Sequence, residues 1–152
     1  MNRRHVLSGV CVLFVAVAGC GAEPGPKSTI EKVVPVSGKL TYLGKPLEHF
    51  QVTFLPSDGR RAAVGVTDAE GKFTMGTNTS GDGAPPGAVK VAVVFVGPPS
   101  TDLPGQEKPI EDPALLPQPK VKIPAKYSNP ETSGLDQNVP DGGLPNLEID
   151  LK

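Results

Sequence analysis

The stretch VTDAEGKFTM, residues 66–75, decides the fold class of this chain. β-forming residues lie on both sides of it, and Asp68, Glu70 and Gly71 lie between them. An Asp at the first position of a tight turn accepts hydrogen bonds from the backbone amides that follow, and a Gly at the last position takes a left-handed conformation. The two acids could alternatively form a metal loop or an acid/base pair. The turn accounts for both ends of the motif, so we predict a β-hairpin connection.

Alternation of apolar and polar residues predicts strands on both sides of this turn, because side chains on a strand point to opposite faces in turn. The longest apolar run, residues 88–96, becomes apolar on both faces toward its end, so we predict a central strand that is covered on both sides there. Loop residues between 123 and 135 offer three apolar anchors. The alternating sets are Val34/Val36/Leu40/Tyr42, Phe50/Val52/Phe54, Ala62/Val64/Val66 against Ala63/Gly65/Thr67, Phe73/Met75, Val89/Val91/Val93/Phe95 and Leu147/Ile149/Leu151, and the anchors are Ile123, Tyr127 and Leu135.

Composition agrees with short strands joined by turns. The 152 residues include 18 Gly and 18 Pro and no Trp, and this interrupts helices. The length suits a single domain. We therefore predict an all-β fold, an antiparallel β-sandwich of about seven strands.

The amino end predicts export and lipidation. A basic start with Arg3 and Arg4 precedes an apolar run from Val6 to Ala18, which is shorter than the roughly 20 residues that span a bilayer. Val17-Ala18-Gly19-Cys20 then resembles a bacterial lipobox, in which the cysteine thiol receives a diacylglycerol with fatty acyl chains such as palmitate. Residues 1–19 are thus a predicted lipoprotein signal peptide and Cys20 the lipidation site. An ordinary export signal, an uncleaved anchor and a twin-arginine signal are the alternatives.

Three further segments complete the predicted organisation. Residues 20–32 form the lipidated Cys and a flexible tether, because their Gly, Pro and polar residues show no periodicity. Residues 33–152 form the sandwich, with a Pro-rich loop at 97–120. The domain would face the periplasm or exterior from the cell membrane or outer membrane. Loss of Arg3 and Arg4 with the signal changes the formal charge from −1 to −3, which does not favour nucleic acid as a partner.

The residues available for chemistry are few. After removal of Cys11 with the signal and lipidation of Cys20, no thiol is left. The single remaining histidine is His49, which the alternation places on the polar side of a predicted strand. One histidine without thiols makes a zinc site improbable, and the Asp-Gly pairs at 58, 82 and 141 lack the spacing of a calcium loop. We expect no catalytic residue, metal or cofactor. A weak calcium site at these turns is the alternative.

Two surface motifs are candidates for a contact or a modification. Lys120, Lys122 and Lys126 near the Pro-rich loop are possible partner contacts to acidic lipid or polymer, and a solvated basic loop is the other interpretation. Asn78-Thr79-Ser80 matches the N-glycosylation pattern, to which we assign no role in a bacterial lipoprotein.

Three stretches carry a resemblance to a known family: VSGKLTYLGKPLEHFQVTFLP, GVTDAEGKFTM and PPGAVKVAV. They resemble the carboxypeptidase regulatory-like domain, which has a transthyretin-like (prealbumin-like) sandwich. Its fold-defining turn corresponds to Thr67, Asp68, Gly71 and Phe73, whereas Val89 departs from a frequent tyrosine. The later IPAKYSNPETSGL and NLEIDLK are similar to small envelope lipoproteins of planctomycete-type bacteria. The resemblance covers residues 33–152.

The resemblance implies a noncatalytic module that binds or positions another envelope component, an unidentified protein or polymer, through a sheet edge or through loop 97–120. A second hypothesis is a small envelope hydrolase acting on glycans or cyclic amides through His49 with Asp68 or Glu70. Related hydroxyisourate hydrolases use several histidines and end in Tyr-Arg-Gly-Ser, whereas this chain ends in Ile-Asp-Leu-Lys. A third is a purely structural envelope protein.

Overall fold

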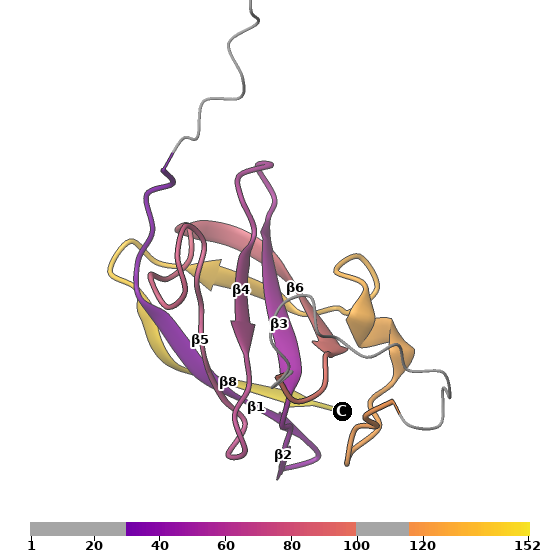
Figure 1. Cartoon of the computed structure of the whole chain (residues 1–152). Coiled ribbons are helices and arrows are strands. Elements are labelled where there is room, and N and C mark those ends of the chain that lie inside the picture. The colour runs from indigo at the N-terminus through magenta and orange to yellow at the C-terminus, as the bar shows by residue number, and fades with distance from the viewer. Residues whose placement is uncertain (1–29, 100–115) are drawn as a thin grey trace, which may run out of the picture.

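The chain folds into two β-sheets that pack face to face (Figure 1). The structure is a computed structural model, and it describes residues 30–99 and 116–152. The all-β sandwich predicted from the alternation is confirmed. The predicted signal peptide at 1–19, Cys20, most of the tether and much of the Pro-rich loop lie outside the described residues. Within the described part, no helix is long and apolar enough to cross a membrane.

The first sheet is built around β1 (Val36–Tyr42). The strand β8 (Leu144–Leu151) lies along one side of β1, and β5 (Lys72–Thr74) and the short β2 (Lys45–Pro46) lie along the other. The second sheet has the order β4-β3-β6-β7. Its strands are β4 (Ala63–Val66), β3 (Phe50–Pro56), β6 (Gly87–Phe95) and β7 (Asp136–Val139).

The core lies between the sheets and consists of the inward residues of each strand. Phe50 and Phe95 meet edge to face, with ring centroids 5.3 Å apart. All three predicted loop anchors pack against this core, and Tyr127, in the 3-10 turn η2 (Ala125–Ser128), is buried. The buried apolar side chains are Val34, Val36, Leu40, Leu47, Phe50, Val52, Phe54, Ala63, Phe73, Met75, Ala84, Val89, Val91, Ala92, Val93, Tyr127, Val139, Ile149 and Leu151.

In β4 the less apolar face is the buried one. Ala63 is fully buried and Gly65 and Thr67 also face inward, whereas Val64 and Val66 are 38% and 51% exposed. The inward position 65 is a glycine because a Cβ there would lie 2.7 Å from the backbone oxygen of Thr74 on β5. The close approach of β5 therefore leaves room only for small residues on the inner face, and the valines point outward.

The sheets also differ from the prediction in three other respects. The strand β6 is central, between β3 and β7, but Val94 and Val96 are 40% and 47% exposed, so its end is not covered on both sides. The pairing of β1 with β8 is parallel, whereas every other recorded strand pair is antiparallel. The strand β7 is not among the predicted strands, because Asp136-Gln137-Asn138 carries no apolar alternation.

Candidate functional site

The turn between β4 and β5 forms as predicted. Asp68 Oδ1 accepts hydrogen bonds from the backbone amides of Glu70 (3.0 Å) and Lys72 (2.8 Å). The Asp68 amide donates to the Lys72 carbonyl (2.9 Å), and the Gly71 amide donates to the Asp68 carbonyl (3.0 Å). The carboxylate of Asp68 thus holds the backbone of its own turn.

The other three residues of the motif tie this turn to the core. Buried Thr67 accepts a hydrogen bond from the Phe50 amide (2.9 Å) and donates one to the Phe50 carbonyl (3.2 Å). Gly71 has φ +75°, and a Cβ there would lie 2.5 Å from the Leu40 carbonyl oxygen. Phe73 is buried against the backbone of Gly38. All four residues have structural contacts.

A groove of about 920 Å³ lies along the β4–β5 hairpin, which is bonded at both ends and open in the middle. The amides and carbonyls of Val64 and Gly76 pair at one end, and Asp68 and Lys72 pair at the other. The same register would place Val66 opposite Thr74, but these two residues form no bridge. The hairpin therefore splits where its two strands join different sheets.

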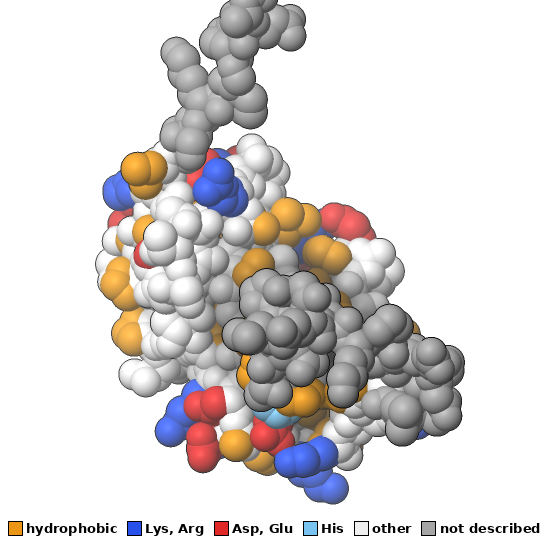
Figure 2. All heavy atoms as spheres, viewed as in Figure 1, with side chains coloured by type: hydrophobic (Ala, Val, Ile, Leu, Met, Phe, Trp, Pro, Cys, Tyr) orange, Lys and Arg blue, Asp and Glu red, His pale blue; other side chains and the backbone are white. Residues whose placement is uncertain are grey.

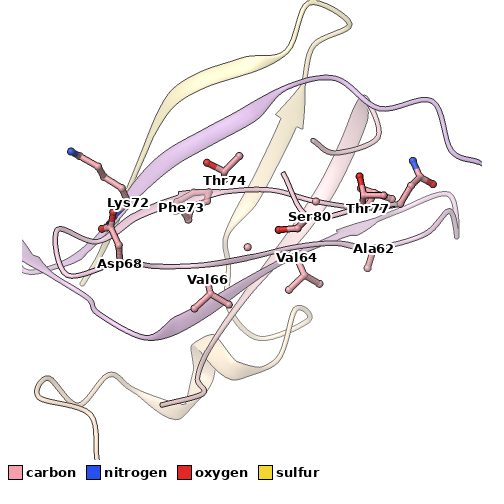
Figure 3. Close-up of a pocket in the computed structure, with 13 residues that line it drawn as sticks. Ala62, Val64, Val66, Asp68, Lys72, Phe73, Thr74, Thr77 and Ser80 are labelled. Atoms are coloured by element: carbon pink, nitrogen blue, oxygen red, sulfur yellow. Dashed lines mark hydrogen bonds between the residues drawn. The ribbon is translucent and has the colours of Figure 1, made fainter. Parts of the chain in front are cut away.

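The walls of this groove, called here the hairpin groove, are chemically mixed (Figure 3). Val64 and Val66 line it from β4, and Thr74 lines it from β5. Figure 3 shows Asp68 and Lys72 together at the turn end, with Ala62 and Thr77 at the opposite end. Loop residues 76–80 contribute hydroxyl groups and an amide. Such a surface offers apolar contact and hydrogen bonding to an elongated ligand but carries no cluster of reactive groups.

The outward face of the second sheet adds further exposed apolar side chains beside the hairpin groove. By the strand register, Val66 lies beside Gln51 and Gln51 beside Val94, and Val64 lies beside Thr53 in the next row. Figure 2 shows hydrophobic side chains at several places on the viewed face of the molecule. We call Leu55, Val64, Val66 and Val94 the outer valine face; all four are between 38% and 51% exposed. Polar Gln51 and Thr53 lie between these apolar side chains, so the outer valine face is a mixed surface, and exposed apolar groups on a sheet face are one mark of contact surfaces.

His49 lies in the bend before β3, with a positive φ of 63°, and not on the polar side of the strand as predicted. Its Nε2 is 3.3 Å from Glu48 Oε1, and Lys120 Nζ is 2.5 Å from Glu48 Oε2. The hydrogen bond from Lys120 lowers the pKa of Glu48 below its usual 4.5, although partial burial of the carboxylate opposes this shift. His49 thus pairs with the carboxylate of Glu48. The hydrolase hypothesis requires Asp68 or Glu70 as its partner, and neither is paired with His49.

The three predicted contact lysines have different surroundings. Lys120 is bound to Glu48, and Lys126 Nζ lies 4.7 Å from the centroid of the Tyr127 ring. Lys122 lines an apolar cleft of about 370 Å³ between β6 and the segment 119–128. The structure therefore does not gather the three charges into one basic patch.

Two of the three acids of the Asp-Gly pairs, Asp58 and Asp82, also hold local hydrogen bonds. Asp82 accepts hydrogen bonds from the amides of Thr77, Asn78 and Thr79, and Asp58 accepts from the amide and the side chain of Arg60. No three His, Cys, Asp or Glu side chains of the described residues are grouped so that they could hold a metal ion. The hydrogen bonds that Asp58 and Asp82 accept account for these two acids.

Sequence reasoning missed the hairpin groove and Glu48. The groove arises where one hairpin divides between two sheets, which no local pattern encodes. Glu48 lies beside His49 in the sequence, and its partner Lys120 is 72 positions away. Comparison with protein-family models, with curated proteins and with solved structures finds no match for this chain.

Proposed function

We propose that this protein is an exported envelope lipoprotein, anchored through lipid on Cys20, whose β-sandwich is a noncatalytic binding or structural module. The proposed class is the carboxypeptidase regulatory-like domain, on the resemblance carried by Thr67, Asp68, Gly71 and Phe73. The hairpin groove together with the outer valine face is the proposed contact surface for an envelope protein or polymer.

One observation carries this proposal. The carboxylates that could do chemistry accept backbone hydrogen bonds instead, while valines that could fill the core are exposed to solvent. Asp68 and Asp82 accept two and three backbone amide hydrogen bonds respectively. Val66 is half exposed on a strand whose other face is filled by Ala63 and Gly65. Exposure of branched apolar side chains gives no folding benefit, whereas burial against a partner removes their surface from water.

The contact surface is tested by site-specific photo-crosslinking in native membranes. A crosslinking residue replaces Val66 on the outer valine face, and a matched one replaces exposed Glu148 on the other sheet. We expect one saturable product from position 66 and none from position 148. The product should disappear when Val64→Glu is added, because a carboxylate would have to be desolvated in the contact. Equal or unsaturable labelling at both positions would refute this contact surface and favour the purely structural hypothesis over a binding module.

The hydrolase hypothesis is tested separately. Purified mature protein is screened for turnover of glycans and cyclic amides, beside His49→Ala as the control variant. We expect no turnover that depends on His49. Activity that His49→Ala abolishes would replace the binding proposal with the enzymatic one.

The anchor is tested by mass spectrometry of the protein extracted from its native membrane. We expect an amino-terminal Cys20 that carries a diacylglycerol and fatty acyl chains. In Cys20→Ser, the precursor should remain unprocessed and without lipid. A mature chain that begins elsewhere would refute lipidation at Cys20.

A further inference from the structure

The chain enters the sandwich through a bonded arm and not through a loose connection. Asn78, in the loop after β5, forms a reciprocal pair with the backbone of Glu31. The Glu31 amide donates to Asn78 Oδ1 and Asn78 Nδ2 donates to the Glu31 carbonyl, each at 3.0 Å. Glu31 and Lys32 were predicted as tether, but they contact the domain, since Lys32 Nζ also lies 3.7 Å from Asp141 Oδ1.

The loop that carries Asn78 is rigidly held. The carboxylate of Asp82 accepts the amides of Thr77 (2.7 Å), Asn78 (3.1 Å) and Thr79 (3.2 Å), and the Thr77 hydroxyl donates to the Gly83 carbonyl (2.9 Å). The hydrogen bond from the Thr77 amide is the main reason why the pKa of Asp82 lies below its usual 3.8. Asn78 is therefore presented to the arm by a preformed loop, which lowers the entropic cost of the pairing.

Two glycines form the walls of the slot through which the arm passes. A Cβ on Gly83 would overlap the carbonyl oxygen of Val34, and a Cβ on Gly143 would lie 2.6 Å from that of Pro35. In this slot the amide and carbonyl of Val34 pair with those of Ala84 (2.9 and 3.0 Å), and the Pro35 carbonyl accepts the Leu144 amide (2.9 Å). The arm is thus enclosed by loops from both sheets.

We propose that residues 31–35 are a strap, clamped by Asn78, which fixes the end of the domain that faces the lipid anchor. This inference rests on the proposed lipidation of Cys20. The loops 57–60, 76–83 and 140–143 lie at the strap end and face the bilayer. The Asp68–Lys72 end of the hairpin groove is presented away from it, toward a partner in the envelope.

The dimensions of the chain support this polarity. The strand β1 continues directly from the strap, and its seven residues span roughly 23 Å to the turn at Leu43. The chain from Gly21 to Ile30 reaches at most about 35 Å. Because the anchored segment joins the domain at the strap, the strap end stays on average closer to the bilayer than the far end. Figure 1 shows the arm leaving at the end opposite β2.

The clamp is tested by trypsin cleavage after Lys32 in the mature lipidated protein in detergent. The Lys32 side chain is 78% exposed, so protection of its peptide bond depends on the strap staying bound. We expect Asn78→Ala to accelerate this cleavage roughly three- to tenfold, because two hydrogen bonds are lost. The control Ser80→Ala changes a neighbouring exposed side chain outside the clamp and should cleave as the wild type does. Equal rates in all three proteins would overturn the clamp.

The polarity is tested by energy transfer to acceptor lipids in vesicles. After processing, Cys20 is the single cysteine and carries lipid, so Ser57→Cys and Leu43→Cys each give one label, at the strap end and at the far end. We expect stronger transfer from position 57. Equal or reversed transfer would overturn the orientation. If mass spectrometry finds Cys20 unmodified, the anchoring fails instead, and the trypsin assay, which needs no membrane, still decides the clamp.

Discussion

At the scale of single residues, the acids of this domain act as backbone acceptors. Asp68 occupies the first position of its turn, where one carboxylate oxygen satisfies two amides that the hairpin leaves without strand partners. Each such hydrogen bond contributes roughly 0.5–1.5 kcal/mol net. The side chain can therefore be replaced by any group that keeps an acceptor in the same place.

Replacement of Asp68 distinguishes this role from a chemical one. We expect Asp68→Ala to lower the free energy of unfolding by about 1–2 kcal/mol, because both amides lose their acceptor. Asp68→Asn keeps an acceptor oxygen and should lose less than half of that. The neighbouring control Glu70→Ala should change stability by no more than about 0.5 kcal/mol. Urea unfolding measures all three, and equal losses in Asp68→Asn and Asp68→Ala would contradict the acceptor role.

Gly83 supports the domain by having no side chain. Its φ is +112°, and a Cβ would collide with the carbonyl of Val34 in the strap. We expect Gly83→Ala to destabilise the protein by more than about 3 kcal/mol, since the clash is with backbone. Gly142→Ala is the matched control, because a Cβ there meets nothing within 4 Å. Thermal unfolding should show a large loss for the first variant and almost none for the second.

At the scale of elements, β4 shows why local patterns predict strands better than faces. Alternation of Ala62, Val64 and Val66 correctly indicates a strand, yet the side facing the core is set by how closely β5 approaches Gly65. That distance depends on a pairing between strands, which the alternating pattern does not contain. The apolar content of a strand face is therefore an incomplete guide to its burial at a sheet edge.

The reversed faces of β4 predict opposite responses to substitution. Val66→Thr should change the free energy of unfolding by no more than about 0.5 kcal/mol, because the side chain is half exposed. Ala63→Leu should cost about 1–3 kcal/mol, since it inserts extra carbons into a filled core. Denaturant midpoints of the two variants measure this. A larger loss in Val66→Thr than in Ala63→Leu would place the valines inside.

The carboxyl end of β8 depends on a contact that the sequence does not reveal. The Tyr127 hydroxyl donates to the Lys152 carbonyl (2.6 Å) and accepts from the Lys152 amide (3.1 Å). We expect Tyr127→Phe to cost about 1–2 kcal/mol and to speed hydrogen exchange at the end of β8, because both bonds are lost while the ring stays packed. Unchanged exchange in β8 would show that β1 alone holds the strand.

At the scale of the whole molecule, sequence reasoning succeeded where interactions are local. The turn at Asp68 and Gly71, the core faces of β1 and β3 and the anchor Tyr127 follow from adjacent residues. The parallel pairing of β1 with β8 joins segments more than a hundred positions apart. The strap pairs Glu31 with Asn78 across 47 positions. Such long-range pairings leave no periodic signal, and neither does the division of the β4–β5 hairpin between two sheets that forms the hairpin groove.

The lowered pKa values of three aspartates determine how the stability of the domain should respond to acid. Backbone hydrogen bonds from Arg60 and from Thr77 are the main causes that lower the pKa values of Asp58 and Asp82, and a hydrogen bond from the Thr41 hydroxyl lowers that of Asp150. A carboxyl whose folded pKa lies below its unfolded value stabilises the fold above the unfolded value, near 3.8 for Asp, and loses that contribution as the pH falls through the folded pKa. The loss therefore begins below about pH 4 to 5.

We expect the urea midpoint to be nearly constant from pH 8 to 5 and to fall steeply from pH 4 to 2. Asp82→Asn keeps an acceptor for the loop but cannot titrate, so its midpoint should fall less over the acid range than that of the wild type. The control Glu70→Gln makes the same carboxyl-to-amide change at a residue that accepts no hydrogen bond among the described residues. An identical acid slope in Asp82→Asn and the wild type would show that the loop amides do not favour the charged form of Asp82. In that case the loop that presents Asn78 to the strap would have to be held by the hydrogen bond from the Thr77 hydroxyl to the Gly83 carbonyl. Thr77→Ala would then be the variant that should release the strap.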